Sequence, residues 1–106
     1  MFRIVRVQYT TKQEYAAKNK ENITKVMNDL RAINNPGIRY STYLLEDGKT
    51  FMHFALFENE AANKILMELE SFKQFQAALK ESVPEVPPKT ENLSLVASSF
   101  DIFAAT

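Results

Sequence analysis

The sequence contains no cysteine and no tryptophan, a single histidine, and only two glycines among its 106 residues. Without cysteine, the chain cannot form a disulfide, offer a thiolate nucleophile or build a zinc site on sulfur. It also lacks an excess of charge of either sign, because 13 basic residues balance 13 acidic ones. A neutral chain has no positive potential to gather phosphates, so we expect no nucleic-acid partner.

Long apolar runs are missing as well. Residues 1–7 already read as a strand that holds two arginines, and no apolar segment reaches the length of a signal peptide or a membrane span. We therefore expect a cytoplasmic protein with no membrane partner. What the chain does contain is 45% hydrophobic residues, with eight Phe and four Tyr, which is enough to pack a core. Its length predicts a single domain over residues 1–106.

Alternation and helical spacing along the chain predict the element order βαββαβ. Thr11 and Glu14 fit a capping box at the start of the first helix, and Asn59 caps a second helical region that a break near Ser71 divides. The prolines between residues 84 and 88 predict a stiff loop after it. The expected strands are residues 2–9, 38–45, 50–57 and 93–103. This order is the ferredoxin-like α+β plan, a four-stranded antiparallel sheet with the helices on one face.

The Asp47-Gly48 pair joins the second and third strands and sets their register. Asp-Gly is the preferred central pair of a type I′ hairpin turn, because both central residues take positive φ. The register predicted from this turn divides the neighbouring residues between two faces, with Tyr40, Thr42, His53 and Ala55 on one and Arg39, Ser41, Tyr43, Met52 and Phe54 on the other.

The third strand is apolar on both of its faces. A small sheet with helices on one side normally shows one wet face, so this strand requires a second cover. The simplest cover is another copy of the same sheet, which predicts a homodimer.

Four segments resemble a known family: Asn35-Pro36-Gly37, Phe51-Met52-His53-Phe54, Phe57-Glu58-Asn59-Glu60-Ala61-Ala62 and Ser71-Phe72-Lys73-Gln74-Phe75. Together they resemble the dimeric α+β barrel superfamily and, within it, the antibiotic-biosynthesis-monooxygenase-like proteins, over nearly the whole chain. The resemblance implies a homodimer in which two sheets pack face to face, with the Arg39 face of each sheet under its helices. Members include oxygenases that act on electron-rich aromatic compounds with no metal or flavin, so it implies no cofactor.

The chain departs from this family at the positions where catalytic residues stand. The haem-degrading branch carries an Asn on the first strand and a Trp and a His in the second helical region, and none of these is present here. Haem degradation is therefore disfavoured. Many other relatives also place a histidine in the second helix, which this chain does not have.

His53 is the one histidine, and it is the natural general base near neutral pH. With Tyr40 and Thr42 on the same face, it predicts a cluster that binds a phenol or quinone and accepts a proton from it. The alternative is that His53 lies between the two sheets of a dimer, where Thr42 or a tyrosine hydroxyl satisfies its hydrogen bonds.

The opposite face offers a second candidate site. Arg39 would anchor a carboxylate or an enolate, Ser41 would line the pocket, and Tyr43 would donate a hydrogen bond or act as a base. The alternative is an edge strand from which Arg39 simply extends into water.

These residues lead to two hypotheses. In the first, the chain is a monooxygenase-like enzyme without metal or flavin that acts on an aromatic or quinol-like compound. Its catalytic residues would be His53 and Tyr43, and its substrate-binding residues Arg39, Ser41 and Tyr40. In the second, the chain is a non-catalytic module that binds a small ligand or serves assembly on the same dimeric barrel.

Overall fold

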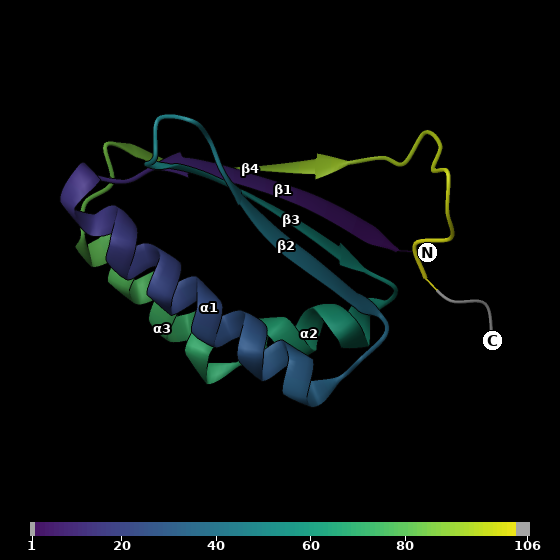
Figure 1. The fold of residues 1–106 in the computed structure, drawn as a ribbon. Helices are drawn as coiled ribbons and strands as arrows, with labels where there is room; N and C mark the ends of the chain where they lie inside the picture. Colours follow the sequence, from purple (N-terminus) through teal and green to yellow (C-terminus); the bar gives the residue numbers. More distant parts are fainter. Residues whose placement is uncertain (1, 104–106) are drawn as a thin grey trace.

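The computed structural model describes residues 2–103. Its elements are β1 (Arg3–Thr10), a short 3₁₀ helix η1 (Gln13–Tyr15), α1 (Ala16–Ile33), β2 (Ile38–Leu44), β3 (Thr50–Phe57), α2 (Glu60–Glu68), α3 (Glu70–Glu81) and β4 (Val86–Leu93). The strands form one antiparallel sheet in the order β2-β3-β1-β4, and the helices lie in a layer on one of its faces (Figure 1). This is the predicted ferredoxin-like α+β plan.

The helix boundaries follow the predicted signals. The side chain of Asn59 accepts a hydrogen bond from the backbone N–H of Ala62 at 2.9 Å and so caps α2. The second helical region is divided as predicted, at Leu69, whose backbone is extended. α1 ends at Ile33, and the next residue, Asn34, has the left-handed conformation with φ of 54°. None of the helices within residues 2–103 is long and apolar enough to cross a membrane.

The register between β2 and β3 is as predicted, with Thr42 opposite His53 and Tyr40 opposite Ala55. The turn itself differs from the expected two-residue type I′ loop. Only Gly48 has a positive φ there, 76°, and its N–H donates to the carbonyl of Leu45 at 3.0 Å. The loop thus spans four residues instead of two. Lengthening a loop by one residue on each side leaves the pairing unchanged, so the register was correct although the turn type was wrong.

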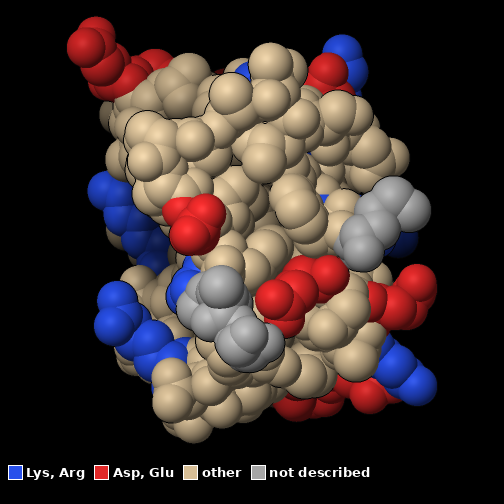
Figure 2. All heavy atoms as spheres, turned by 90° about the vertical axis from the view of Figure 1, so that its right-hand side faces the viewer, with Lys and Arg blue, Asp and Glu red and all other residues tan. Residues whose placement is uncertain are grey.

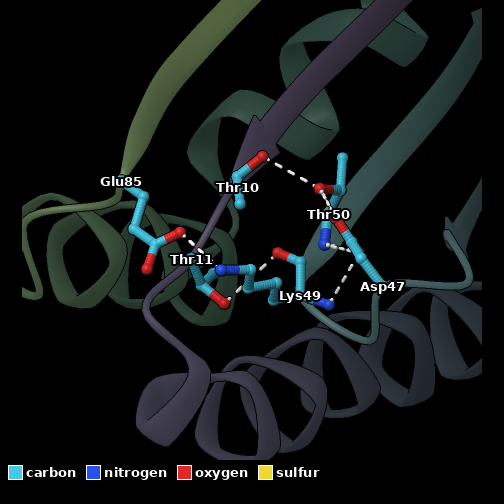
Figure 3. A network of polar contacts seen from close by, with 6 residues as sticks. All are labelled: Thr10, Thr11, Asp47, Lys49, Thr50 and Glu85. Atoms are coloured by element: carbon cyan, nitrogen blue, oxygen red, sulfur yellow. Dashed lines mark hydrogen bonds and ion pairs between the residues drawn. The ribbon is translucent and has the colours of Figure 1, made fainter.

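Asp47 holds this loop together (Figure 3). Its carboxylate accepts hydrogen bonds from the backbone N–H groups of Lys49 and Thr50, at 3.0 and 2.8 Å, and from the Thr50 hydroxyl. The N–H and the hydroxyl of Thr11 both donate to the carbonyl oxygen of Lys49. The predicted capping box is therefore not formed, because Thr11 ties the end of β1 to the hairpin while the helical segment begins at Gln13.

The last strand lies earlier than predicted. We expected it at 93–103 after a proline loop, whereas β4 is Val86–Leu93 and contains Pro87 and Pro88. β4 is an edge strand, and the two prolines stand opposite Tyr9 where the pairing with β1 shifts by one residue. An edge bulge is one of the few sheet positions that tolerate the missing N–H of proline.

The segment after β4 lies at the end of the molecule where β1 begins (Figure 1). The ring of Phe103 meets that of Phe2 edge-on, with their centroids 5.5 Å apart. Figure 2 views this end and shows a broad surface without charged side chains in the upper half of the view, with acidic side chains nearer the centre. Val96 and Phe100 contribute large exposed apolar side chains in this segment.

The core lies between the helices and the sheet face that carries His53. Tyr9, Phe51, Ala55 and Phe57 of this face pack with Ile23 and Val26 of α1, Leu66 of α2 and Phe72, Phe75 and Leu79 of α3. The face prediction is therefore wrong. We expected Arg39, Ser41 and Tyr43 to lie under the helices, and instead the helices cover Tyr40, Thr42 and His53. Strand alternation fixes which residues share a face and leaves open which face is covered.

Candidate functional site

A cavity of about 620 Å³ lies between the helix-covered face of the sheet and helices α2 and α3. Its lining is mainly aliphatic and aromatic, with Val5 and Val7 from β1, Leu66 from α2 and Phe72 and Phe75 from α3. This volume and lining are typical of sites that enclose a small apolar ligand.

His53 lines this cavity, and both of its ring nitrogens are hydrogen-bonded. Nε2 lies 2.8 Å from the hydroxyl of Tyr9, and Nδ1 lies 2.7 Å from the hydroxyl of Tyr40 and 3.0 Å from that of Thr42. The predicted cluster of histidine, tyrosine and threonine is therefore present. Tyr9 and Tyr40 also line the cavity, so the polar wall of the site is built from three different strands.

Two members of this network were missed from the sequence. Tyr9 faces His53, and the amide Nδ2 of Asn19 in α1 donates to the Tyr9 hydroxyl at 2.8 Å. Asn19 is completely buried, and it occupies a position on the apolar stripe of α1 between Ala16 and Ile23. A polar residue in that stripe was the available signal, because a buried amide requires a partner.

Burial keeps the network uncharged at neutral pH. It lowers the pKa of His53 to about 4, so the imidazole is neutral. Burial also raises the pKa of the Tyr9 and Tyr40 hydroxyls, which therefore keep their protons. The site thus presents neutral hydrogen-bonding groups to its ligand.

The charged residues that line the cavity are all basic. Arg3 at the start of β1 and Lys80 near the end of α3 contribute to the lining, and no aspartate or glutamate does. Arg3 Nη1 lies 3.5 Å from the side-chain oxygen of Asn63. Within residues 2–103, neither Arg3 nor Lys80 forms an ion pair with a carboxylate. An anionic group on a ligand would therefore meet positive potential without a competing negative charge.

Three predicted site residues lie away from this cavity. Tyr43 is 56% exposed on the uncovered face, where its ring meets that of Phe54 edge-on. Arg39 donates through Nε to the carbonyl of Ile102 at 3.1 Å, and with Ser41 it borders a second hollow of about 480 Å³ between α1 and β2. The structure brings together His53 and Tyr40 of the predicted set in the first cavity, which Tyr43, Arg39 and Ser41 do not line, and Tyr40 also borders the second hollow with Arg39 and Ser41.

No protein-family model and no curated protein matches this sequence, whereas solved structures match its fold. Rv0793 from Mycobacterium tuberculosis superimposes with a TM-score of 0.77 at 15% identity, covering 94% of this chain and all of the other. A protein from Bacteriodes thetaiotaomicron, provisionally named as an antibiotic biosynthesis monooxygenase, gives 0.80 at 9% identity over 94% of each chain. SnoaB from Streptomyces nogalater gives 0.70 at 11% identity, covering 94% and 98%.

This chain has their fold. SnoaB is described as a cofactor-independent oxygenase. The resemblance to antibiotic-biosynthesis-monooxygenase-like proteins, which we inferred from four short segments, is therefore confirmed at the level of the fold. Identities of 9 to 15% do not carry an activity from one protein to another.

Proposed function

We propose that this chain is an enzyme that oxidises a small aromatic or quinol-like compound with dioxygen, bound in the cavity beside His53. The observation that carries the proposal is the cavity itself, apolar on most of its surface and polar where Tyr9, His53 and Tyr40 meet. A cofactor-independent oxygenase with the same fold supports it.

In this reaction the ring supplies the electrons. A phenol reacts with one dioxygen so that a ring C–H becomes C=O, which yields a quinone and one water. A quinol instead transfers two electrons and two protons to dioxygen, which yields a quinone and hydrogen peroxide. The phenol binds as its phenolate after losing its hydroxyl proton to solvent, and Tyr40, held by His53, is positioned to donate a hydrogen bond to the phenolate oxygen. Tyr43, Arg39 and Ser41 have no part in this proposal, because they do not line this cavity.

Removing one hydroxyl tests this site. Tyr40→Phe is expected to lower dioxygen consumption with a naphthol or naphthohydroquinone at least about tenfold, because one hydrogen-bonding group at the reacting oxygen is lost. Tyr43→Phe is the matched control and should retain the wild-type rate, since Tyr43 lies on the other face. An oxygen electrode measures both variants. Equal rates in wild type and Tyr40→Phe would remove Tyr40 from the mechanism.

The competing function is a ligand-binding module without chemistry. It is favoured by the fact that both nitrogens of His53 already have partners within the protein. The two functions separate when binding and turnover are measured on the same compound. Stabilisation by a naphthol in a thermal-shift assay, with no dioxygen uptake, would support the module and contradict the enzyme.

The basic lining predicts a preference for anionic ligands. We expect 2-naphthoate to bind more tightly than naphthalene, by about twofold to fivefold, as solvent-exposed charge pairs provide. Arg3→Gln and Lys80→Gln should each reduce this preference, whereas Lys73→Gln, an exposed lysine of α3 outside the lining, should not. Titration at low and high salt checks the electrostatic origin, because screening weakens the preference. Tighter binding of naphthalene would show that the two cations do not contribute.

We also propose that the chain forms a homodimer through the uncovered face of the sheet. Met52, Phe54 and Leu56 give this face an apolar centre that no helix covers (Figure 1). Beside it, Arg6 and Glu91 form an ion pair at 2.6 Å, so the charge of Arg6 on the central strand β1 is already compensated within the chain. A second copy of the same face would bury the apolar strip.

A charge placed on this strip should prevent association. Phe54→Glu is expected to shift the mass measured by light scattering from dimer to monomer, because a buried unpaired carboxylate costs several kcal/mol. Lys25→Glu on the exposed side of α1 is the control and should leave the mass unchanged. A monomeric mass for the wild-type protein would contradict the proposed dimer.

A further inference from the structure

Four side chains, the buried Asn19, Tyr9 and His53 and the half-buried Tyr40, form a continuous series of hydrogen bonds that ends at the cavity. Asn19 contacts Tyr9, Tyr9 contacts Nε2 of His53, and Nδ1 of His53 contacts Tyr40, with heavy-atom distances of 2.7 to 2.8 Å. A hydroxyl has one proton to donate, and so does a neutral imidazole. When each hydroxyl in the series accepts one bond and donates the next, the direction of the bond at Asn19 sets the direction of the others.

The direction can be derived from the Asn19 end. The Asn19 amide donates to the Tyr9 oxygen, so the Tyr9 proton goes to Nε2 of His53. His53 then carries its own proton on Nδ1 and donates it to the hydroxyl oxygen of Tyr40 or Thr42. Tyr40 also shares a hydrogen bond with the hydroxyl of Thr42. When Thr42 is the donor of that bond, the hydroxyl proton of Tyr40 remains available to a ligand in the cavity, which Tyr40 lines.

The opposite direction requires the Asn19 amide to be turned over. The Asn19 carbonyl would then accept from Tyr9, His53 would be protonated on Nε2, and Tyr40 would donate inward. In the orientation observed, the unpaired atom is the Asn19 oxygen Oδ1. Turning the amide over would place its two N–H groups where Oδ1 now lies and take them away from Tyr9. Buried carbonyl oxygens without a partner are tolerated more often than buried N–H groups, so the observed orientation is favoured.

We propose that Asn19, acting through Tyr9, holds the proton of His53 on Nδ1 and thereby makes Tyr40 a hydrogen-bond donor to an acceptor oxygen of the ligand. The ligand part of this proposal rests on the proposed function, since it requires a compound in the cavity. The ligand class it selects is one with a carbonyl or phenolate oxygen. In the oxidation, Tyr40 would stabilise the negative charge that develops on the ring oxygen. Asn19 and Tyr9 are positioning residues.

The tautomer of His53 can be observed directly, because the chain has one histidine and its ¹⁵N-labelled ring gives a single set of signals. We expect the proton on Nδ1 in the wild-type protein. Asn19→Ala should lower the Nδ1–H population and raise that of Nε2–H, because Tyr9 loses the donor that orients it. Asn22→Ala is the control and should keep the wild-type tautomer. It replaces an asparagine of the same helix that does not belong to this series of hydrogen bonds.

A wild-type spectrum with the proton on Nε2 would overturn the proposal. This measurement does not require the Asn19→Ala variant to fold. An unchanged tautomer in folded Asn19→Ala would also overturn it, because Asn19 would then not set the direction.

A pair of ligands of similar shape tests the donor role of Tyr40. 1-Tetralone carries an acceptor oxygen, and tetralin does not. We expect 1-tetralone to bind about threefold to tenfold more tightly, which is the net value of one hydrogen bond, and Tyr40→Phe to abolish the difference. Equal affinities in the wild-type protein would contradict the donor role while leaving the cavity as a binding site. Failure of both compounds to bind would contradict the proposed function and leave the tautomer result standing.

Discussion

Lowering the pH from 6.5 to 4 is expected to reduce the free energy of unfolding by about 3 kcal/mol through His53 alone. In the unfolded chain the imidazole titrates near pH 6.5, whereas burial lowers the pKa of His53 in the folded protein to about 4. Between these values the unfolded state binds a proton that the folded state does not. Stability therefore falls as the pH falls, and the loss from this group is nearly complete at pH 4.

Urea unfolding at a series of pH values measures this effect in the wild-type protein and in His53→Gln, whose side chain is polar but does not titrate. The two free energies should run parallel above pH 6.5 and diverge below it, with the wild-type protein losing more. Hydrogen bonds from Thr50 and Lys49 lower the pKa of Asp47, so the stability that this group contributes is lost mainly at more acidic pH, and in both proteins alike. Parallel curves down to pH 4 would show that His53 is not buried as a neutral group.

The same burial limits what His53 does in a reaction. A group with a pKa of about 4 is a weak base at neutral pH, and full transfer of a proton to it would place a charge in the core. Directional hydrogen bonding through Tyr40 requires no such charge. This favours a role in which His53 orients Tyr40 and takes part in proton transfer only as negative charge develops on the bound ring.

Two patterns in the sequence bear on this site, the hairpin between β2 and β3 and the alternation of residues along β1. The Asp47-Gly48 hairpin predicted the correct partners of His53 on β2, Tyr40 and Thr42. The pairing was correct despite the error in turn type, because both loops keep the same residues opposite each other. The hairpin register alone, however, does not show which of its two faces the helices cover. The sequence of β1 indicates which face is covered. Val7 pairs with His53 on the apolar side of β1, whereas the other side of β1 carries Arg6.

Two further differences have local causes. Pro87 and Pro88 predicted a loop because proline has no N–H group to donate to a neighbouring strand. An edge strand with a bulge does not need these N–H groups. The sequence pattern alone does not show which strand will lie at the edge. Asn19 was missed because the buried side of the helix was predicted from its apolar residues alone, and Asn19 is polar. Its partner Tyr9 comes from another element, and that pairing exists only once α1 is packed on the sheet.

Phe51→Ala is expected to lower the free energy of unfolding by about 3 to 5 kcal/mol, the range for removing a buried phenylalanine from a core. Phe51 is 2% exposed, and its ring stacks on that of Tyr9 with their centroids 5.6 Å apart. Phe100→Ala is the matched control, since a ring that is 70% exposed should contribute less than about 0.5 kcal/mol.

Phe51 does not line the cavity, so Phe51→Ala also tests whether packing in the core holds the residues of the site in position. Losing the stacked ring gives Tyr9 room to move, so the bond from Tyr9 to Nε2 of His53 should weaken even in molecules that remain folded. Urea unfolding measures the first effect, and the ¹⁵N spectrum of His53 measures the second. A loss of stability below about 1 kcal/mol would show that the helices do not bury this face of the sheet. A large loss with an unchanged histidine spectrum would show that Asn19, without the stacking ring, is sufficient to hold Tyr9 in place.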